Sequence, residues 1–153
     1  MIDTLKNIES VDDPNEKLKI LELVVLNIKN GISIPENDII QIILKLFKSD
    51  NELIRIKATE ISEFLKDDII IDTLIERLSN DESYFVRGFA AKALGSIGNI
   101  KARPELEKAV FDKEGFVVAF AGQALKAINM KLSFSSKLDM LKMKIRENQQ
   151  WLI

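Results

Sequence analysis

Two arginines and one glycine-rich stretch are the residues best suited to bind an anion. Arg55 and Arg87 lie 32 residues apart, and an arginine presents planar N–H donors that suit a carboxylate or a phosphate. The stretch Gly95-Ser96-Ile97-Gly98 has the composition of a phosphate-binding loop. However, it follows a helical pattern rather than a strand and lacks the Gly-Lys-Ser/Thr that such loops carry. We therefore expect it to end a helix.

Three carboxylates gather near one face of a predicted helix: Glu60, Glu63 and Asp67. Such a cluster could hold a hard cation, but without histidine or a loop-type series of ligands it is typical of a solvated acidic surface. The chain contains no histidine and no cysteine. This removes the commonest metal ligand, the usual side chain for proton transfer near neutral pH, and all thiolate chemistry. We therefore expect no catalytic site, no metal and no cofactor.

These residues lie on a unit that is repeated along the chain. Residues 81–98 and 112–128 share Asp, Phe, Val, Phe, Ala, Ala-Leu and Ile in the same order at an offset of 31, and Leu46, Leu78 and Val110 recur at steps of 32. Self-similarity at this period is typical of stacked helical units. We predict an all-α superhelix, or solenoid, that forms one domain over residues 1–153. It would contain a short leading helix near residues 2–9 and about four helical hairpins, at residues 14–48, 50–79, 81–111 and 113–149.

The hydrophobic pattern of single segments predicts how each helix is buried. Residues 15–28 are apolar on nearly all sides, which predicts a core helix packed from several directions. Residues 67–78 predict a shorter helix. The last helix, at about residues 133–149, carries apolar residues at steps of four, three and four: Phe134, Leu138, Leu141 and Ile145. Four further aromatic side chains are expected to be buried against neighbouring repeats: Phe85, Phe111, Phe116 and Trp151.

The repeated unit carries the pattern Asp-(x4)-Val-Arg-x-x-Ala-(x2)-Ala-Leu-(x2)-Ile. Residues 81–97 meet it in full, residues 112–128 meet it except that Val118 replaces the arginine, and residues 50–65 meet it in part. This pattern resembles the HEAT-repeat superfamily, in particular its short repeats of the bilin-lyase type. The resemblance implies that the Asp and Arg of adjacent repeats bond to each other as a ladder. Arg55 and Arg87 would be its rungs, and the ladder would stop at Val118.

The resemblance also implies where a partner would bind. In this superfamily the second helices of the repeats usually line the concave side. Their outward positions here form a row of mixed charge, which suits a protein partner better than DNA and suits a solvated surface equally well. The HEAT-like metal hydroxylases depend on His-Glu pairs, and this chain has no histidine. We expect the candidate row to comprise Gln41, Lys45, Lys48, Asp72, Thr73, Glu76, Arg77, Glu107 and Lys108.

Charge is distributed unevenly along the chain. Residues 1–79 carry 16 acidic and 10 basic side chains, a net charge of −6, whereas residues 80–153 carry 8 acidic and 12 basic ones, a net charge of +4. A basic last helix could meet an acidic protein surface, nucleic acid or a membrane, or it could be the polar outer face that a terminal repeat needs. Nucleic acid is disfavoured because the basic patch lies at one end without interleaved aromatic residues. The candidate contacts in this patch are Lys137, Lys142, Lys144 and Arg146.

Together these features predict a non-catalytic module for protein–protein interaction, either an adaptor or a stoichiometric inhibitor of the immunity-protein kind. The alternatives are a HEAT-like lyase or chaperone, and a nucleic-acid-binding protein. The N-terminus has no basic region followed by an apolar core, and the apolar runs are shorter than the roughly 18 residues that suggest a membrane span. We expect a cytoplasmic protein with no membrane segment, either a monomer or a weak oligomer.

Overall fold

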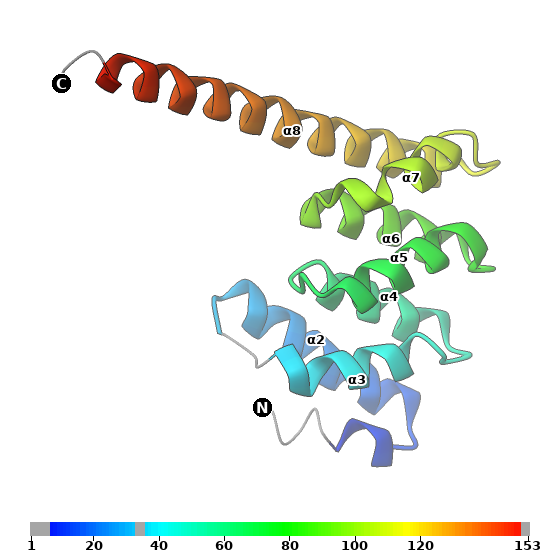
Figure 1. Cartoon of the computed structure of the whole chain (residues 1–153). Helices are drawn as coiled ribbons and strands as arrows, with labels where there is room; N and C mark the ends of the chain where they lie inside the picture. The colour runs from blue at the N-terminus through cyan, green and yellow to red at the C-terminus, as the bar shows by residue number, and fades with distance from the viewer. Residues whose placement is uncertain (1–6, 33–35, 151–153) are drawn as a thin grey trace.

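The computed structural model describes residues 7–32 and 36–150, which form helices joined by turns. The prediction of an all-α solenoid is confirmed: successive helices run back and forth and stack in one direction from the N-terminus to the last helix (Figure 1). The elements in chain order are η1 (Ile8–Ser10), α2 (Pro14–Lys29), α3 (Glu36–Leu46), α4 (Glu52–Ser62), α5 (Asp68–Asn80), α6 (Tyr84–Ile97), η2 (Ile100–Ala102), α7 (Arg103–Ala109) and α8 (Gly115–Gln150).

Short polar side chains set the starts of the helices. Asp13, Asn51 and Asp67 each accept a hydrogen bond from a backbone N–H of the following turn, at 3.0, 2.9 and 2.8 Å. Such caps satisfy donors that have no partner within the helix. Glycines with positive φ follow two helices, Gly31 (φ 83°) after α2 and Gly98 (φ 71°) after α6. The prediction that the glycine-rich stretch ends a helix is therefore confirmed.

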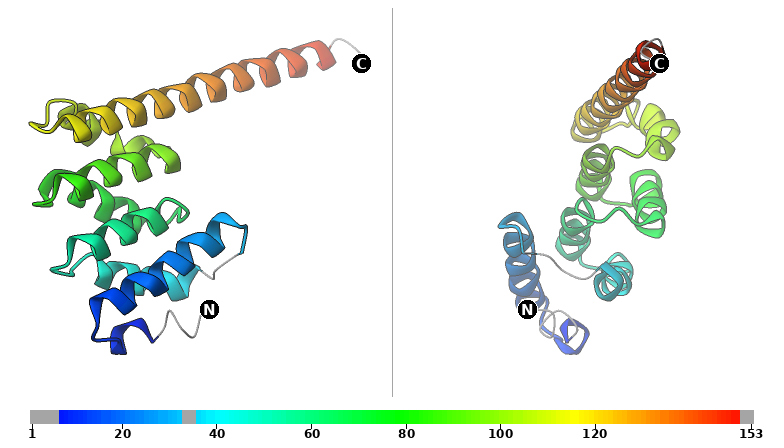
Figure 2. Two further views of the ribbon diagram at one scale, coloured as in Figure 1. Left: turned by 180° about the vertical axis from the view of Figure 1, so that it is seen from behind. Right: turned by 60° about the vertical axis from the view of Figure 1, so that its left-hand side comes forward.

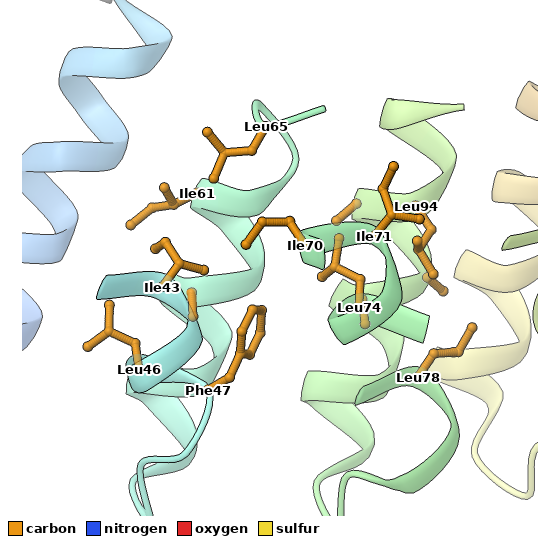
Figure 3. Close-up of a cluster of buried hydrophobic side chains, with 14 of the residues drawn as sticks. Ile43, Leu46, Phe47, Ile61, Leu65, Ile70, Ile71, Leu74, Leu78 and Leu94 are labelled. Atoms are coloured by element: carbon orange, nitrogen blue, oxygen red, sulfur yellow. The ribbon is translucent and has the colours of Figure 1, made fainter. Parts of the chain in front are cut away.

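The helices form two layers. α2, α4, α6 and α8 lie side by side in the first layer, and α3, α5 and α7 lie in the second (Figures 1 and 2). The hydrophobic core fills the space between the layers and runs from repeat to repeat. Figure 3 shows part of it, with Ile61 of α4 and Leu65 of the following turn on one side of Ile70 and Leu74 of α5, and Leu94 of α6 on the other. Each hairpin buries its apolar side chains only against its neighbours, as in other solenoids.

The fourth hairpin, predicted at residues 113–149, does not form. α8 is one continuous helix of 36 residues, and its second half extends beyond the rest of the stack (Figures 1 and 2). The repeat period suggested a turn just before residue 133, but the segment Asn129-Met130-Lys131-Leu132 contains neither glycine nor proline. Because no residue there breaks or caps the helix, helical hydrogen bonding continues through it. The prediction of a separate last helix at residues 133–149 was wrong.

Two predictions about α2 and α5 also need correction. α2 is not packed from several directions, because in the first layer only α4 lies beside it. Leu23 and Leu26 on its outer side are 59% and 54% exposed. α5 is not shorter than its partner, since it has 13 residues against 11 in α4. The leading helix predicted near residues 2–9 lies mostly outside the described residues. The described part of the chain begins with residue 7 and contains η1 at Ile8–Ser10.

The aromatic residues that were expected to be buried differ in their environment. Phe111, at the turn after α7, is 87% exposed, so that prediction was wrong. Its exposure follows from the missing fourth hairpin, whose second helix would have lain beside α7. Phe85 is 36% exposed and Phe116 is half-buried. Trp151 lies outside the described residues.

Candidate partner-binding surfaces

The Arg55 guanidinium is held by groups of the chain itself. Its Nε and Nη2 each donate to the Asp81 carboxylate at 3.0 Å, and its Nη1 donates to the carbonyls of Ser49 and Asp50 at 2.9 and 3.1 Å. A further bond from Nη2 to Glu82, at 3.3 Å, engages the fifth N–H donor. Burial is the largest single influence and opposes the charged form, but the Asp81 hydrogen bond and the charges of Asp81, Glu82 and Glu52 together outweigh it, so the pKa of Arg55 is raised. No donor of this side chain is left for a ligand.

Arg87 repeats this geometry one unit later. Its Nε and Nη2 donate to Asp112 at 2.9 and 3.0 Å, and its Nη1 donates to the carbonyls of Asp81 and Glu82 at 2.9 and 3.3 Å. The hydrogen bond from Arg87 lowers the pKa of the Asp112 carboxyl, and partial burial opposes this shift only in part. The ladder implied by the family resemblance is therefore confirmed. It stops at Val118, whose side chain has no donor.

The three carboxylates considered as a cation site each have a different partner within the chain. Glu60 pairs with Lys57 at 2.9 Å, Glu63 pairs with Lys92 of α6 at 3.3 Å, and Asp67 caps α5. In the part of the chain that the structure describes, no group of three or more acidic side chains could hold a metal ion. These carboxylates join neighbouring turns and repeats.

The candidate row on the second layer is exposed, but most of its charges are paired within the chain. Seven of its nine members are exposed, whereas Thr73 and Arg77 are half-buried. Lys45 donates to Glu9 at 2.7 Å. Pairing with Asp72 raises the pKa of Lys101. The other pairs along the row are Asp72–Lys101 at 2.5 Å, Glu76–Arg77 at 2.7 Å, Glu107–Arg103 at 2.8 Å and Lys108–Glu105 at 2.9 Å.

Four members of the row differ in how free they are to contact a partner. The Thr73 hydroxyl donates to a backbone carbonyl of the preceding turn at 2.8 Å, and Arg77 Nη1 lies 3.5 Å from the ladder residue Asp81. These two side chains have structural partners. Lys48 and Gln41 are exposed, and Lys48 lines a shallow hollow between η1 and α3 together with Lys45 and Glu9.

The second half of α8 leaves the stack just after Ile128. Lys131 connects it to α6: its Nζ donates to the carbonyls of Ser96 and Ile97 at 2.9 and 3.2 Å. The C-terminal end of a helix favours a positive charge at this place. We call residues 129–146 the projecting segment. Every side chain described in this segment is exposed. It carries the four predicted basic contacts Lys137, Lys142, Lys144 and Arg146.

Large apolar side chains form two rows on the projecting segment. Phe134, Leu138 and Leu141 follow each other at helical spacing and are 70%, 42% and 57% exposed. A second row on the opposite side contains Leu132, Met140 and Met143. Apolar side chains exposed as a contiguous group mark sites of interaction. The described part of the chain contains no helix, α8 included, that is long and apolar enough to cross a membrane.

An aromatic cluster joins α6 and α8 in the first layer, and the sequence reasoning missed it. The Phe85 and Phe116 ring centroids lie 5.3 Å apart, Phe89 and Phe120 lie 6.1 Å apart, and Phe116 and Phe120 lie 4.9 Å apart. Tyr84 packs on Phe85 at its outer edge, at 4.2 Å. The signal was present in the sequence, because Phe85 and Phe89 recur as Phe116 and Phe120 at the repeat offset of 31.

Two layers of helices, a shared core and arginine–aspartate rungs between repeats define this protein as an α-solenoid repeat protein. The family model for HEAT repeats matches residues 37–126 and 71–152, so the chain belongs to the HEAT-repeat family. No curated protein matches the chain with significant sequence similarity. HEAT repeats form helical repeat proteins that often mediate interactions between proteins.

Proposed function

We propose that this HEAT-repeat protein is a non-catalytic module that binds another protein, as an adaptor or as a stoichiometric inhibitor of the immunity-protein kind. The observation that carries the proposal is the projecting segment, whose apolar rows and basic side chains are exposed along a helix that has left the stack. Full burial of one leucine or phenylalanine side chain is worth about 1.5–3 kcal/mol. Phe134, Leu138 and Leu141 are 70%, 42% and 57% exposed, so each would contribute part of this free energy when a partner covers it.

The row on the second layer is the weaker of the two candidate surfaces. A partner that binds there has to compete with pairs such as Lys45–Glu9 and Asp72–Lys101. Exposed pairs of this kind contribute little, so they do not prevent binding. The row offers charge but little exposed apolar area, which favours a supporting role in orienting the partner.

A non-catalytic role is supported by the side chains available for chemistry. The whole sequence contains no histidine and no cysteine, which removes the side chains most often used for proton transfer near neutral pH and for thiolate attack. The two arginines that suit an anionic substrate are occupied by Asp81 and Asp112. Their donors hold repeats together instead of facing an open site.

The proposal is tested by affinity capture of the full chain, followed by cross-linking and mass spectrometry, with matched variants. A stoichiometric protein partner should be captured by the unchanged chain and lost by Leu138→Asp, because a carboxylate would be buried in the interface. The control is Leu26→Asp on α2, which is similarly exposed at the other end of the stack and should keep the partner. Recovery of only nucleic acid or a pigment would overturn the proposal.

A further inference from the structure

The first apolar row of the projecting segment has the spacing of a coiled-coil seam. Phe134, Leu138 and Leu141 are separated by four and then three residues, which is the alternation of the two seam positions in a heptad repeat. The same residues are 70%, 42% and 57% exposed. A seam of this kind is complete only when a second helix packs into it.

The seam continues a side of α8 that already packs on a helix in the first half. Phe120, Ala127, Phe134 and Leu141 follow at steps of seven, so they stay near one side of the helix, with a drift of about 20° per step. At Phe120 this side contacts Phe89 of α6. α6 ends at Ile97, and its last carbonyls are bonded to Lys131 of α8. A partner helix in line with α6 would therefore continue an existing helix–helix interface.

The residues beside the seam select the charge of that partner. The flanking positions are the heptad positions next to the seam. They are occupied by Ser135, Lys137, Lys142 and Lys144. In a coiled coil, flanking residues of the two helices face each other and set the choice of partner. A second copy of this chain would place lysines opposite lysines, in the parallel and in the antiparallel orientation alike.

We propose that the projecting segment binds an amphipathic helix of another protein that has an apolar seam flanked by glutamate or aspartate. The proposal rests on the proposed protein-binding function and names the class of its partner. A membrane surface fits this segment less well, because a helix that lies on lipid has one apolar face and one polar face. Here Leu132, Met140 and Met143 place a second apolar row on the side opposite the seam.

The test uses the full chain and two designed three-heptad peptides that share one leucine seam and differ only in their flanking residues, Glu in one and Lys in the other. Fluorescence anisotropy should show binding of the Glu peptide and weaker binding, by about tenfold or more, of the Lys peptide. The difference should shrink at about 1 M NaCl, where charges are screened within about 3 Å. The triple variant Lys137→Glu, Lys142→Glu, Lys144→Glu should reverse the preference.

Two single variants assign the binding to the seam. Leu138→Asp should abolish binding of the Glu peptide, whereas Leu26→Asp on α2 should leave it unchanged. Both positions are exposed, so circular dichroism should report the same helix content for both variants and for the parent chain. Equal binding of the two peptides, or loss of binding in both variants, would overturn the proposal.

The other occupants of the seam have distinct signatures in the same experiments. Sedimentation could show concentration-dependent dimerisation that Leu138→Asp abolishes. This result would mean that a second copy fills the seam, and it would overturn the proposal. Binding to anionic vesicles but not to the Glu peptide would overturn it in favour of lipid. If Leu138→Asp abolishes capture of a protein partner that the Glu peptide cannot displace, the proposed function stands and only this inference fails.

Discussion

The Asp81 carboxylate accepts two hydrogen bonds from Arg55, each 3.0 Å long, and its side chain is 2% exposed. The same carboxylate accepts a bond from the backbone N–H of Ser83 at 3.0 Å, and the Asp81 carbonyl accepts one from Arg87 at 2.9 Å. One aspartate thus orders the turn before α6, binds the arginine of the repeat before it and helps to orient the arginine of its own repeat. This explains why the Asp and Arg recur together in the sequence.

The arginine rungs should be major contributors to stability. Arg55→Ala should lower the free energy of unfolding by about 3 kcal/mol, because it leaves the Asp81 carboxylate buried with fewer partners. Arg87→Ala should cost about 2 kcal/mol, since the Asp112 side chain is 16% exposed against 2% for Asp81. Urea unfolding followed by circular dichroism measures both. Lys92→Ala, which breaks an exposed pair with Glu63, is the control and should cost less than about 1 kcal/mol. Equal effects of all three would contradict the ladder.

The Arg87–Asp112 pair should make stability depend on pH in the acidic range. Arg87 lowers the pKa of Asp112 below its ordinary value of 3.8. A carboxyl whose pKa is lower in the folded state contributes stability above the unfolded pKa and loses it as the pH falls through the folded pKa. The difference in unfolding free energy between the parent chain and Asp112→Asn should therefore be constant near neutral pH and shrink below about pH 4. A constant difference down to pH 2 would show that the carboxylate charge is not involved.

The first and the last helix show what the sequence pattern could and could not predict. The repeat offset located the helices of the central repeats, because these bury the same apolar positions against a neighbour on each side. It failed at α2 and α8, where one neighbour is missing. Leu23 is apolar and exposed at one end, and the Phe134 row is apolar and exposed at the other. An apolar pattern indicates that a helix face packs against another element. It does not indicate whether that element belongs to the same chain.

The sequence predicted the residues of the candidate site better than it predicted how they are arranged in space. The basic residues of the last helix were identified from composition, and the structure places them on the exposed projecting segment. The outward row of the second helices was identified from helical spacing. Its pairing with residues such as Glu9 and Lys101 depends on how turns approach one another in space. No spacing rule within one helix contains that information.

Gly95 of α6 should be required for the close approach of α6 and α8. A Cβ at this position would lie 2.7 Å from the Cα and Cβ of Ala124. Gly95→Ala should therefore lower the unfolding free energy by about 1 kcal/mol, because overpacking of about 1–3 kcal/mol exceeds the gain in helix propensity of about 1 kcal/mol. The matched control is Gly122→Ala on α8, where a Cβ meets no atom within 4 Å. It should raise stability by up to about 1 kcal/mol. Thermal unfolding of both variants separates the two effects, and a stabilised Gly95→Ala would disprove the contact.

The continuity of α8 through residues 129–132 can be measured with spin labels, because the chain has no cysteine that would compete for labelling. Labels at the exposed positions Ala119 and Arg146 are 27 residues apart, which corresponds to about 40 Å along one helix at 1.5 Å per residue. In a hairpin with its turn at residues 129–132, the two labels would face each other across packed helices, whose axes are about 10 Å apart. Pulsed electron paramagnetic resonance should give a narrow distribution near the longer distance. Met130→Pro, which breaks helical hydrogen bonding at an exposed site, should broaden it. A short distance in the parent chain would restore the fourth hairpin and remove the projecting segment as a binding surface.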